Sequence, residues 1–243
     1  MLTKSEVKYI QSLQQKKFRD EQGIFVAEGP KLVKELLDSG HFRCQELFVT
    51  EEMTEWTQGL SIRPRLISSA ELERISGLQT PNAMLALFEK NNPAEVDPAG
   101  KITLLLDDIQ DPGNLGTIIR TADWFGVRNI VASTSTADCY NSKVVQSTMA
   151  SLGRVNILYT EPEVWVRQYP DLPVFAASPQ GSDIRTIQPP AEGILIIGNE
   201  SKGIRHALMG QADQLLKIPG KGTAESLNAA VAAGILMFWL NGN

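Results

Sequence analysis

Along the second half of the chain, short apolar runs alternate with longer stretches in which apolar and polar residues mix at helical spacing. The run ITLLLDD at 102–108 is apolar almost throughout, as in a strand buried on both faces. Further strands are predicted at 129–133, 155–159, 173–178, 193–198 and 214–219. Helices are predicted at 114–125, 141–151, 162–168, 200–209 and 224–240. This alternation predicts a mostly parallel six-stranded sheet with helices on both faces and ligand-binding loops at the carboxyl ends of the strands.

The N-terminal part of the chain shows the same alternation on a smaller scale. Its predicted helices lie at 4–16, 30–39 and 69–75, and its predicted strands at 23–29, 46–50 and 83–89. The segment NNPAEVDPAGK at 91–101 is rich in residues that break regular structure and has little to bury, which is typical of a linker. We therefore expect two domains, a smaller α/β domain over 1–95 and a larger one over 96–243.

Composition and charge narrow the classes of partner. With 42% hydrophobic and 21% charged residues, the chain has an ordinary globular composition. A net charge of −5 argues against coating by nucleic acid over the whole surface, although a local basic patch can still bind phosphate. Such an excess occurs over residues 1–19, where a solvated helix face is the simpler explanation. Its basic residues are Lys4, Lys8, Lys16, Lys17 and Arg19.

Several classes of site are disfavoured. Cys44 and Cys139 are the two cysteines and lie far apart, which favours a reducing cytoplasm over a disulfide framework. With two histidines in the chain, we expect no histidine-rich metal site. The opening MLTKSEVKYIQSLQQKK lacks the apolar core of a secretion signal. The longest apolar run, at 229–240, is too short to cross a bilayer, so we expect a core helix and no membrane segment.

Two of the loops at the predicted strand ends carry polar residues beside strong turn signals. The loop at 107–127 contains Asp-Pro-Gly before a helix that holds Asn114 and Arg120. A helix cap would explain Asn114, and a surface ion pair would explain Arg120. The turn at 198–203 has the strand, glycine and helix order of a phosphate site. However, Glu200 lies where a pyrophosphate would need bare backbone N–H groups.

A third loop, KIPGKGTAESLNAAVAAG at 217–234, places Ser226 and Asn228 in the first turn of a predicted helix. Capping would explain both residues when they are considered alone. In their order along the chain, the three segments resemble the three motifs of the SpoU/TrmH family of RNA ribose 2′-O-methyltransferases. They match as D-D-x-x-D-P-G-N-x-G-x-x-x-R-T-A, x-G-x-E-x-x-G and I-P…S-L-N-x-x-V-A.

The resemblance covers residues 102–240 and extends weakly into the N-terminal part. There FVAEGPKLVKELL and TPNAMLALF resemble the substrate-binding module of the family, so we expect residues 1–95 to bind RNA. The resemblance also implies a deep C-terminal trefoil knot of the SPOUT type, formed by the last two motif loops. Neither periodicity nor composition could reveal such a knot. Family members act as homodimers, and Phe238 and Trp239 could line that interface or the core.

The cofactor implied by the resemblance is S-adenosylmethionine. It carries an adenosine and a sulfonium but no phosphate, so a glycine-lined turn can approach it closely and tolerate the Glu200 carboxylate. Matching positions assign the cofactor contacts to Ala176, Ser178, Gly198, Asn199, Gly203, Ile218 and Leu227. They assign the catalytic roles to Arg120, Asn114, Glu200, Ser226 and Asn228.

The motif loops contain no histidine or cysteine, so the usual general bases are absent. A guanidinium group holds its proton firmly, and we therefore expect Arg120 to bind a phosphate and stabilise the nascent alkoxide. Asn114, Ser226 and Asn228 would orient the ribose and Arg120. Glu200 would fix its own turn or reach Arg120, and Arg120 could act in its own site or in that of a partner subunit.

The RNA itself is expected to be large-subunit ribosomal RNA rather than transfer RNA, because similar N-terminal modules occur in ribosomal RNA enzymes. Four alternatives remain open at this point. They are a transfer RNA 2′-O-methyltransferase, a knotted methyltransferase that acts on a base, a non-catalytic RNA-binding protein and a dinucleotide-binding oxidoreductase. The last requires a complete glycine fingerprint, which residues 113–116 do not supply.

Overall fold

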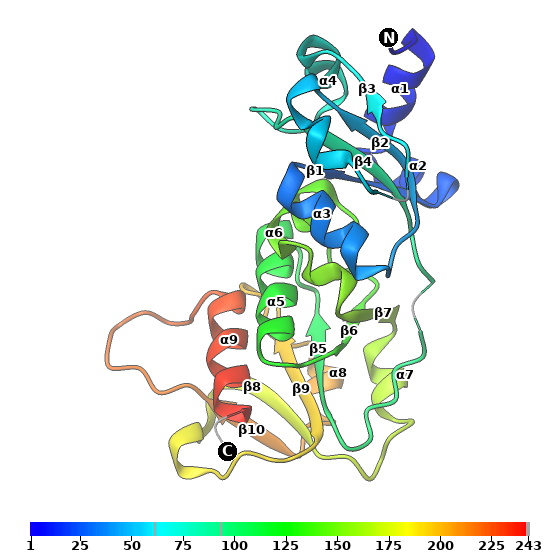
Figure 1. Cartoon of the computed structure of the whole chain (residues 1–243). Helices are drawn as coiled ribbons and strands as arrows, with labels where there is room; N and C mark the ends of the chain where they lie inside the picture. Colours follow the sequence, from blue (N-terminus) through cyan, green and yellow to red (C-terminus); the bar gives the residue numbers. More distant parts are fainter. Residues whose placement is uncertain (61, 93, 242–243) are drawn as a thin grey trace. The chain divides into compact units, whose positions relative to one another are not determined.

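The computed structural model describes residues 1–60, 62–92 and 94–241, and the chain forms two compact units (Figure 1). The first unit combines residues 1–92 with the segment 138–154. The second contains the intervening stretch up to Ala137 and everything from Val155 onward. A single boundary near residue 95 would assign the segment 138–154 to the second unit. In the structure this segment belongs to the first unit, although it follows a strand of the second. The roles of the two units stay a prediction.

The second unit is a six-stranded sheet flanked by helices, as the sequence predicts. Its strands are β5 (Ile102–Asp107), β6 (Asn129–Ser133), β7 (Asn156–Thr160), β8 (Val174–Asp183), β9 (Gly193–Gly198) and β10 (Gln214–Lys217). Its helices are α5 (Pro112–Trp124), α7 (Pro162–Val166), η4 (Ile184–Thr186), α8 (His206–Met209) and α9 (Ala229–Leu240). The strand order is β10-β8-β9-β5-β6-β7, and every pairing is parallel.

The sheet of the second unit is buried on both faces, which explains its unbroken apolar strands. One face packs Leu105 and Ile196 against Trp165 of α7 and Leu208 of α8. Because side chains alternate along a strand, Leu104 faces the other way, and it is also fully buried. On α5, the residues that face the sheet are fully buried, and they are Leu115, Ile118, Ile119 and Ala122.

Two predicted helices of the second unit begin later than expected. The helix predicted at 200–209 is reduced to α8, because the Asn199 side chain accepts hydrogen bonds from the N–H groups of Ser201 and Lys202 and closes a turn there. The helix predicted at 224–240 begins at Ala229, since Asn228 caps it by accepting hydrogen bonds from two backbone N–H groups. The trefoil knot stays a prediction.

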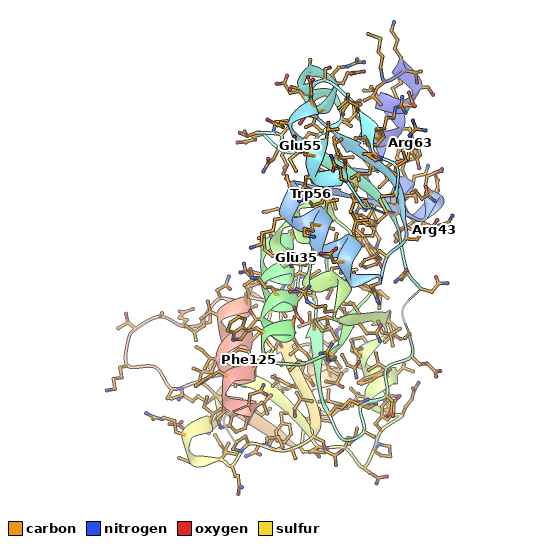
Figure 2. All side chains as sticks on the ribbon, viewed as in Figure 1. Glu35, Arg43, Glu55, Trp56, Arg63 and Phe125 are labelled. Carbon is orange, nitrogen blue, oxygen red and sulfur yellow. The ribbon has the colours of Figure 1, made fainter. Side chains whose placement is uncertain are left out.

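Helix α9 is apolar on all sides but is buried on one face only. Phe238 is 67% exposed and Val231 is 50% exposed, so the expectation of a core helix holds for the opposite face alone. Phe125, at the end of α5, lies beside α9, and its ring stands 6.2 Å from that of Phe238 (Figure 2). Among the described residues, no helix combines the length and apolar character that a bilayer crossing requires.

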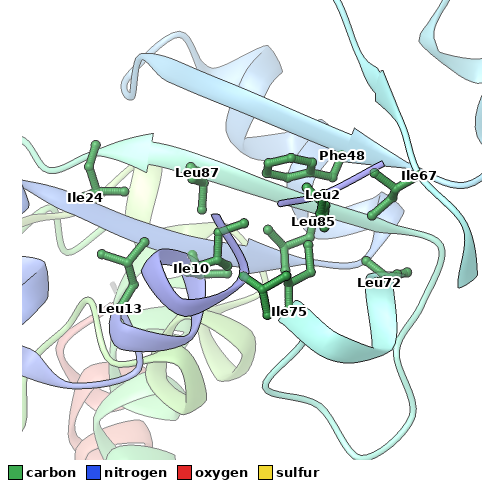
Figure 3. Close-up of a cluster of buried hydrophobic side chains, with 12 residues drawn as sticks. Leu2, Ile10, Leu13, Ile24, Phe48, Ile67, Leu72, Ile75, Leu85 and Leu87 are labelled. Carbon is green, nitrogen blue, oxygen red and sulfur yellow. The ribbon is translucent and has the colours of Figure 1, made fainter. Parts of the chain in front are cut away.

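The first unit is a four-stranded sheet with helices. Its helices are α1 (Lys4–Ser12), α2 (Lys16–Gln22), α3 (Pro30–Ser39), η1 (Glu51–Met53), η2 (Glu55–Thr57), α4 (Ser69–Ile75), α6 (Ser142–Thr148) and η3 (Ser151–Gly153). Its strands are β1 (Ile24–Glu28), β2 (Cys44–Val49), β3 (Arg65–Leu66) and β4 (Met84–Glu89), in the order β1-β4-β2-β3. Apolar side chains of α1 and α4, including Ile10 and Ile75, pack on Leu85 and Leu87 of β4 (Figure 3).

The helix predicted at 4–16 ends early, at Ser12, and a second helix, α2, begins at Lys16 and carries a buried arginine. Arg19 of α2 is 2% exposed, and its Nη1 donates hydrogen bonds to the carbonyl groups of Leu13 and Gln14, where α1 ends. Those carbonyls would otherwise lack partners at the helix end. The other guanidinium nitrogens, Nε and Nη2, lie 3.1 and 2.6 Å from Asp138 Oδ2. Arg19 is therefore a structural residue and not part of a basic surface.

This ion pair predicts a large stability difference between two aspartate substitutions. Asp138→Asn leaves the Arg19 charge buried without its partner, which should lower the free energy of unfolding by about 3–5 kcal/mol. Asp38→Asn, in an exposed pair with Lys34 on α3, should cost only about 0–1 kcal/mol. Urea denaturation of both variants measures the difference, and equal effects would contradict the assigned role.

Candidate active site

A chain of side-chain hydrogen bonds joins the three motif loops of the second unit. The Asn114 Nδ2 group donates to the Glu200 carboxylate. Its Oδ1 accepts a hydrogen bond of 2.9 Å from Nδ2 of Asn228. Because α5 supplies Asn114, the turn after β9 supplies Glu200 and the cap of α9 supplies Asn228, one amide connects all three loops.

Asn114 does not cap α5, although a helix cap would explain this residue in the sequence. The cap of α5 is Asp111, whose carboxylate accepts a 2.8 Å hydrogen bond from the Asn114 N–H. The Asn114 side chain is therefore available for the other two loops. Glu200, which was expected to fix its turn or reach Arg120, instead holds Asn114.

The turn at 198–203 brings two backbone segments into close contact. The backbone groups of Asn199 and Gly203 hydrogen-bond each other at 3.1 and 2.9 Å, and Asn199 Nδ2 donates to the carbonyl group of Asp108 at 2.8 Å. A Cβ atom on Gly198 would lie 2.5 Å from the Gly203 backbone, so no other residue fits without displacing the turn. Gly203 has a φ of +69°, which favours glycine.

The neighbouring strand supplies a second wall beside that turn. Strand β8 extends to Asp183, beyond its predicted end at 178, and its register against β10 shifts between Leu215 and Leu216. Ala176 pairs with Leu215 and Ser182 with Leu216, so residues 177–181 form an excursion from the ladder. Ala176 and Ser178 are buried there, and Ala176 belongs to the hydrophobic core of the sheet, so their contact with a cofactor stays a prediction.

The third motif loop is less closely packed. Residues 221–228 are exposed, and Figure 1 shows the connection from β10 to α9 projecting away from the sheet. Ile218 is half-buried, whereas Leu227 is 45% exposed. Ser226, which was expected in the first helical turn, lies before α9 because Asn228 forms the cap. In the described chain, no hydrogen bond joins Ser226 to Asn114 or Glu200.

Arg120 is exposed on α5 and has neither a hydrogen bond nor a salt bridge to any described residue, which leaves its guanidinium free. Trp124 follows one helical turn later and is 83% exposed. The surface ion pair considered for Arg120 is not formed within the described ranges.

An ion pair that the sequence does not predict lies beneath the loops. Asp107, at the end of β5, is 1% exposed and accepts hydrogen bonds from the backbone N–H and the Nε of Arg205, each at 2.8 Å. Although desolvation acts to lower the pKa of Arg205, hydrogen bonding to Asp107 leaves that pKa above its ordinary value. This pair anchors the turn at 198–203 to the end of β5. The sequence shows two adjacent acidic residues, Asp107 and Asp108, at the end of a predicted strand. No local pattern identifies Arg205 as the partner of Asp107.

The turn at 198–203 disfavours a dinucleotide. Gly198 allows the turn to close tightly on the Gly203 backbone, and the Glu200 carboxylate would repel a pyrophosphate. Comparison with known proteins agrees: residues 101–238 match the model of the SpoU rRNA Methylase family. The chain belongs to this family. Residues 4–86 match the MRM3-like substrate binding domain.

Relatives of this SpoU family member align over nearly their whole length. The 23S rRNA (guanosine(2553)-2′-O)-methyltransferase RlmP of Bacillus subtilis (strain 168) is 32% identical, with 98% of this chain and 96% of the relative covered. A structure of an rRNA methyltransferase from Sinorhizobium meliloti with bound AdoMet has 33% identity and a TM-score of 0.89, covering 100% and 96%. A putative RNA methyltransferase of the TrmH family from Porphyromonas gingivalis has 35% identity and a TM-score of 0.87, covering 99% and 98%. Family membership removes the oxidoreductase alternative.

The close contact between Gly198 and the Gly203 backbone predicts that one added methyl group will disturb cofactor binding and stability. Gly198→Ala should displace Gly203 and abolish measurable binding of S-adenosylmethionine, and overpacking should cost about 1–3 kcal/mol of stability. Gly210→Ala is the matched control, because its nearest described neighbour would be an ordinary 3.6 Å away. Isothermal titration calorimetry of both folded variants tests this. Unchanged affinity in Gly198→Ala would show that the cofactor does not use this turn.

Proposed function

We propose that this SpoU family member transfers the methyl group of S-adenosylmethionine to a ribose 2′-hydroxyl of ribosomal RNA. The observation that carries the proposal is the Asn228–Asn114–Glu200 chain, which joins the three motif loops at one place. The names of the Bacillus subtilis and Sinorhizobium meliloti relatives favour ribosomal RNA over transfer RNA. They favour an enzyme over a non-catalytic RNA-binding protein, and the ribose over the base. We also place the protein in the cytoplasm, where such RNA is modified.

When bound, S-adenosylmethionine supplies an electrophilic methyl group. The wall at Ala176 and Ser178, the turn at 198–203 and the residues Ile218 and Leu227 would hold it. Leu227 lies on the exposed segment 221–228, so its contact would form as that segment packs on the adenosine, whereas Ile218 is already half-buried.

The remaining residues act on the RNA. Asn114 and Asn228 position the ribose, and Glu200 holds Asn114 in the orientation that this requires. The free guanidinium of Arg120 binds a phosphate next to the target nucleotide and stabilises the 2′-oxygen as its bond to the methyl group forms and its proton passes to water. Ser226 joins this set if its loop packs inward.

We assign RNA capture largely to the first unit, because residues 4–86 match a substrate binding domain. Its surface lysines near the N-terminus are suited to phosphate contacts. Lys4, Lys8, Lys16 and Lys17 are all exposed, whereas Arg19 is buried and does not contribute.

We further infer that the protein acts as a homodimer through α5 and α9. Trp124 and Phe238 lie on these two packed helices and expose most of their surface, which is unusual for such large apolar side chains. A second copy of this chain fits the face because a symmetric contact would bury the same residues from both sides. Arg120 lies one turn from Trp124, so it stands beside the partner and could serve either site.

The role of Arg120 predicts a loss of chemistry without a loss of cofactor binding. Arg120→Lys keeps the charge but removes the planar fork, and Arg120→Ala removes both. Each should cost on the order of 3 kcal/mol of transition-state stabilisation, or roughly a hundredfold in rate. Single-turnover transfer of a tritiated methyl group to unmodified large-subunit ribosomal RNA measures this, with calorimetry for the cofactor.

Arg167→Lys, on the exposed end of α7, is the matched control and should behave like the parent protein. A rate for Arg120→Lys within about threefold of the parent protein would overturn the assigned role.

The proposed interface predicts the outcome of placing charge on it. Trp124→Glu and Phe238→Glu should each convert a dimer to a folded monomer, because an aromatic residue buries about 150–250 Å² and a carboxylate would be desolvated in its place. Val164→Glu, at a 57% exposed position on α7, should leave the dimer intact. Sedimentation equilibrium distinguishes these results, and a monomeric parent protein would refute the inference.

A further inference from the structure

A cavity of about 390 Å³ opens on the second unit beside the candidate active site. It is lined by Asp107, Asp108, Gln110, Ser135, Lys202, Gly203 and Arg205. The turn at 198–203 separates it from the Asn114 amide, because Glu200 contacts Asn114 while Lys202 and Gly203 line the cavity. Its volume falls within the range typical of small-ligand pockets, roughly 300–1,000 Å³.

The orientation of the Asp108 backbone in this cavity is held from both sides. Its N–H donates to Ser133 Oγ at 2.9 Å, and its carbonyl accepts from Asn199 Nδ2 at 2.8 Å. Asp108 has a φ of 59°, a conformation that is uncommon for residues other than glycine and concentrates at functional sites. Its backbone therefore directs the side chain away from the regular path of β5.

The carboxylate of Asp108 is only loosely occupied by protein groups. Gln110 Nε2 lies 3.0 Å from Oδ1, and Lys202 Nζ lies 3.7 Å from Oδ2. Both partners have exposed side chains, and that of Lys202 is 74% exposed, so either can move aside at little cost. By contrast, Asp107 is committed to Arg205 through both of its oxygens. Asp108 is thus the acceptor that the cavity offers to a ligand.

We propose that this cavity receives the base of the nucleotide whose ribose is methylated, and that Asp108 selects guanine. This rests on the proposed function. Guanine presents two adjacent donors, N1–H and the 2-amino group, which match the two oxygens of a carboxylate. Lys202 and Gln110, once displaced from Asp108, can donate to the O6 acceptor of the same edge. The cavity therefore complements all three polar groups on the Watson–Crick edge of guanine.

The other bases fit this arrangement poorly. Uracil has a single donor, N3–H, between two carbonyl acceptors, so the second carboxylate oxygen would face a carbonyl group. Adenine and cytosine each place a ring nitrogen acceptor beside their amino group, which repels a carboxylate. Desolvating Asp108 without two donors costs free energy and rejects these bases.

The test begins with the product of the parent protein. Unmodified Bacillus subtilis large-subunit ribosomal RNA, offered free and in ribosomal particles, is methylated with tritiated S-adenosylmethionine and digested to nucleosides. We expect 2′-O-methylguanosine. A labelled 2′-O-methyluridine, cytidine or adenosine would overturn the base assignment and leave the proposed function intact. No labelled nucleoside from a protein that binds the cofactor would overturn both.

A second experiment tests Asp108 itself, using an RNA fragment that carries guanosine or inosine at the mapped position. Inosine lacks the 2-amino donor, so the parent protein should methylate it about tenfold less efficiently, mainly through a higher KM. Asp108→Asn should lower kcat/KM on guanosine about tenfold and treat the two fragments alike. Asp171→Asn, at an exposed aspartate outside the cavity, should keep the parent preference.

Calorimetry with S-adenosylmethionine confirms that both variants are folded and load the cofactor. If Asp108→Asn retains the full preference for guanosine over inosine, Asp108 does not read the base.

Discussion

The side-chain amide of Asn114 is the contact on which the arrangement of the three motif loops depends. It donates to Glu200 and accepts from Asn228, so loops that are far apart in the sequence are held at one place. Each hydrogen bond contributes only about 0.5–1.5 kcal/mol to stability, which does not explain three convergent loops. The placement of the loops matters more than their stability, because a displacement of 1 Å at a reacting group can cost on the order of a hundredfold in rate.

The residues that cap α5 and α9 determine which side chains are available for this network. Asp111 caps α5, and the Asn114 amide is therefore not needed for the helix end. Asn228 does both jobs, since its Oδ1 caps α9 while its Nδ2 reaches Asn114. The rigid helix ends thus carry Asn114 and Asn228, whereas Ser226 and Leu227 lie on the exposed loop before α9. Polar residues at helix starts are ambiguous in a sequence because one residue type serves both purposes.

The sequence predicts the parts of the fold that follow from periodicity. The apolar runs of β5, β6 and β9 require burial on both faces, and these strands match closely. Long-range pairings are different, since no local pattern shows that Arg19 is buried against Asp138 or that Arg205 pairs with Asp107. The sequence also does not predict the excursion at 177–181, because these residues resemble a strand end followed by a turn. Family resemblance identifies the motif residues in the sequence, but no sequence pattern shows which of them contact one another.

The two consecutive aspartates at the end of β5 show how a strand end can divide two tasks between neighbours. Asp107 and Asp108 both line the cavity, but they differ in burial and in their partners. Asp107 is buried and neutralised by Arg205, which anchors the turn at 198–203. Asp108 turns out of the ladder with a positive φ and keeps its carboxylate in the cavity. Because the anchored turn also carries Glu200 and Lys202, the ion pair at Asp107 helps to fix the Asn114 amide and the Asp108 carboxylate relative to one another. If the proposed roles hold, this single strand end links the geometry of methyl transfer to the choice of nucleotide.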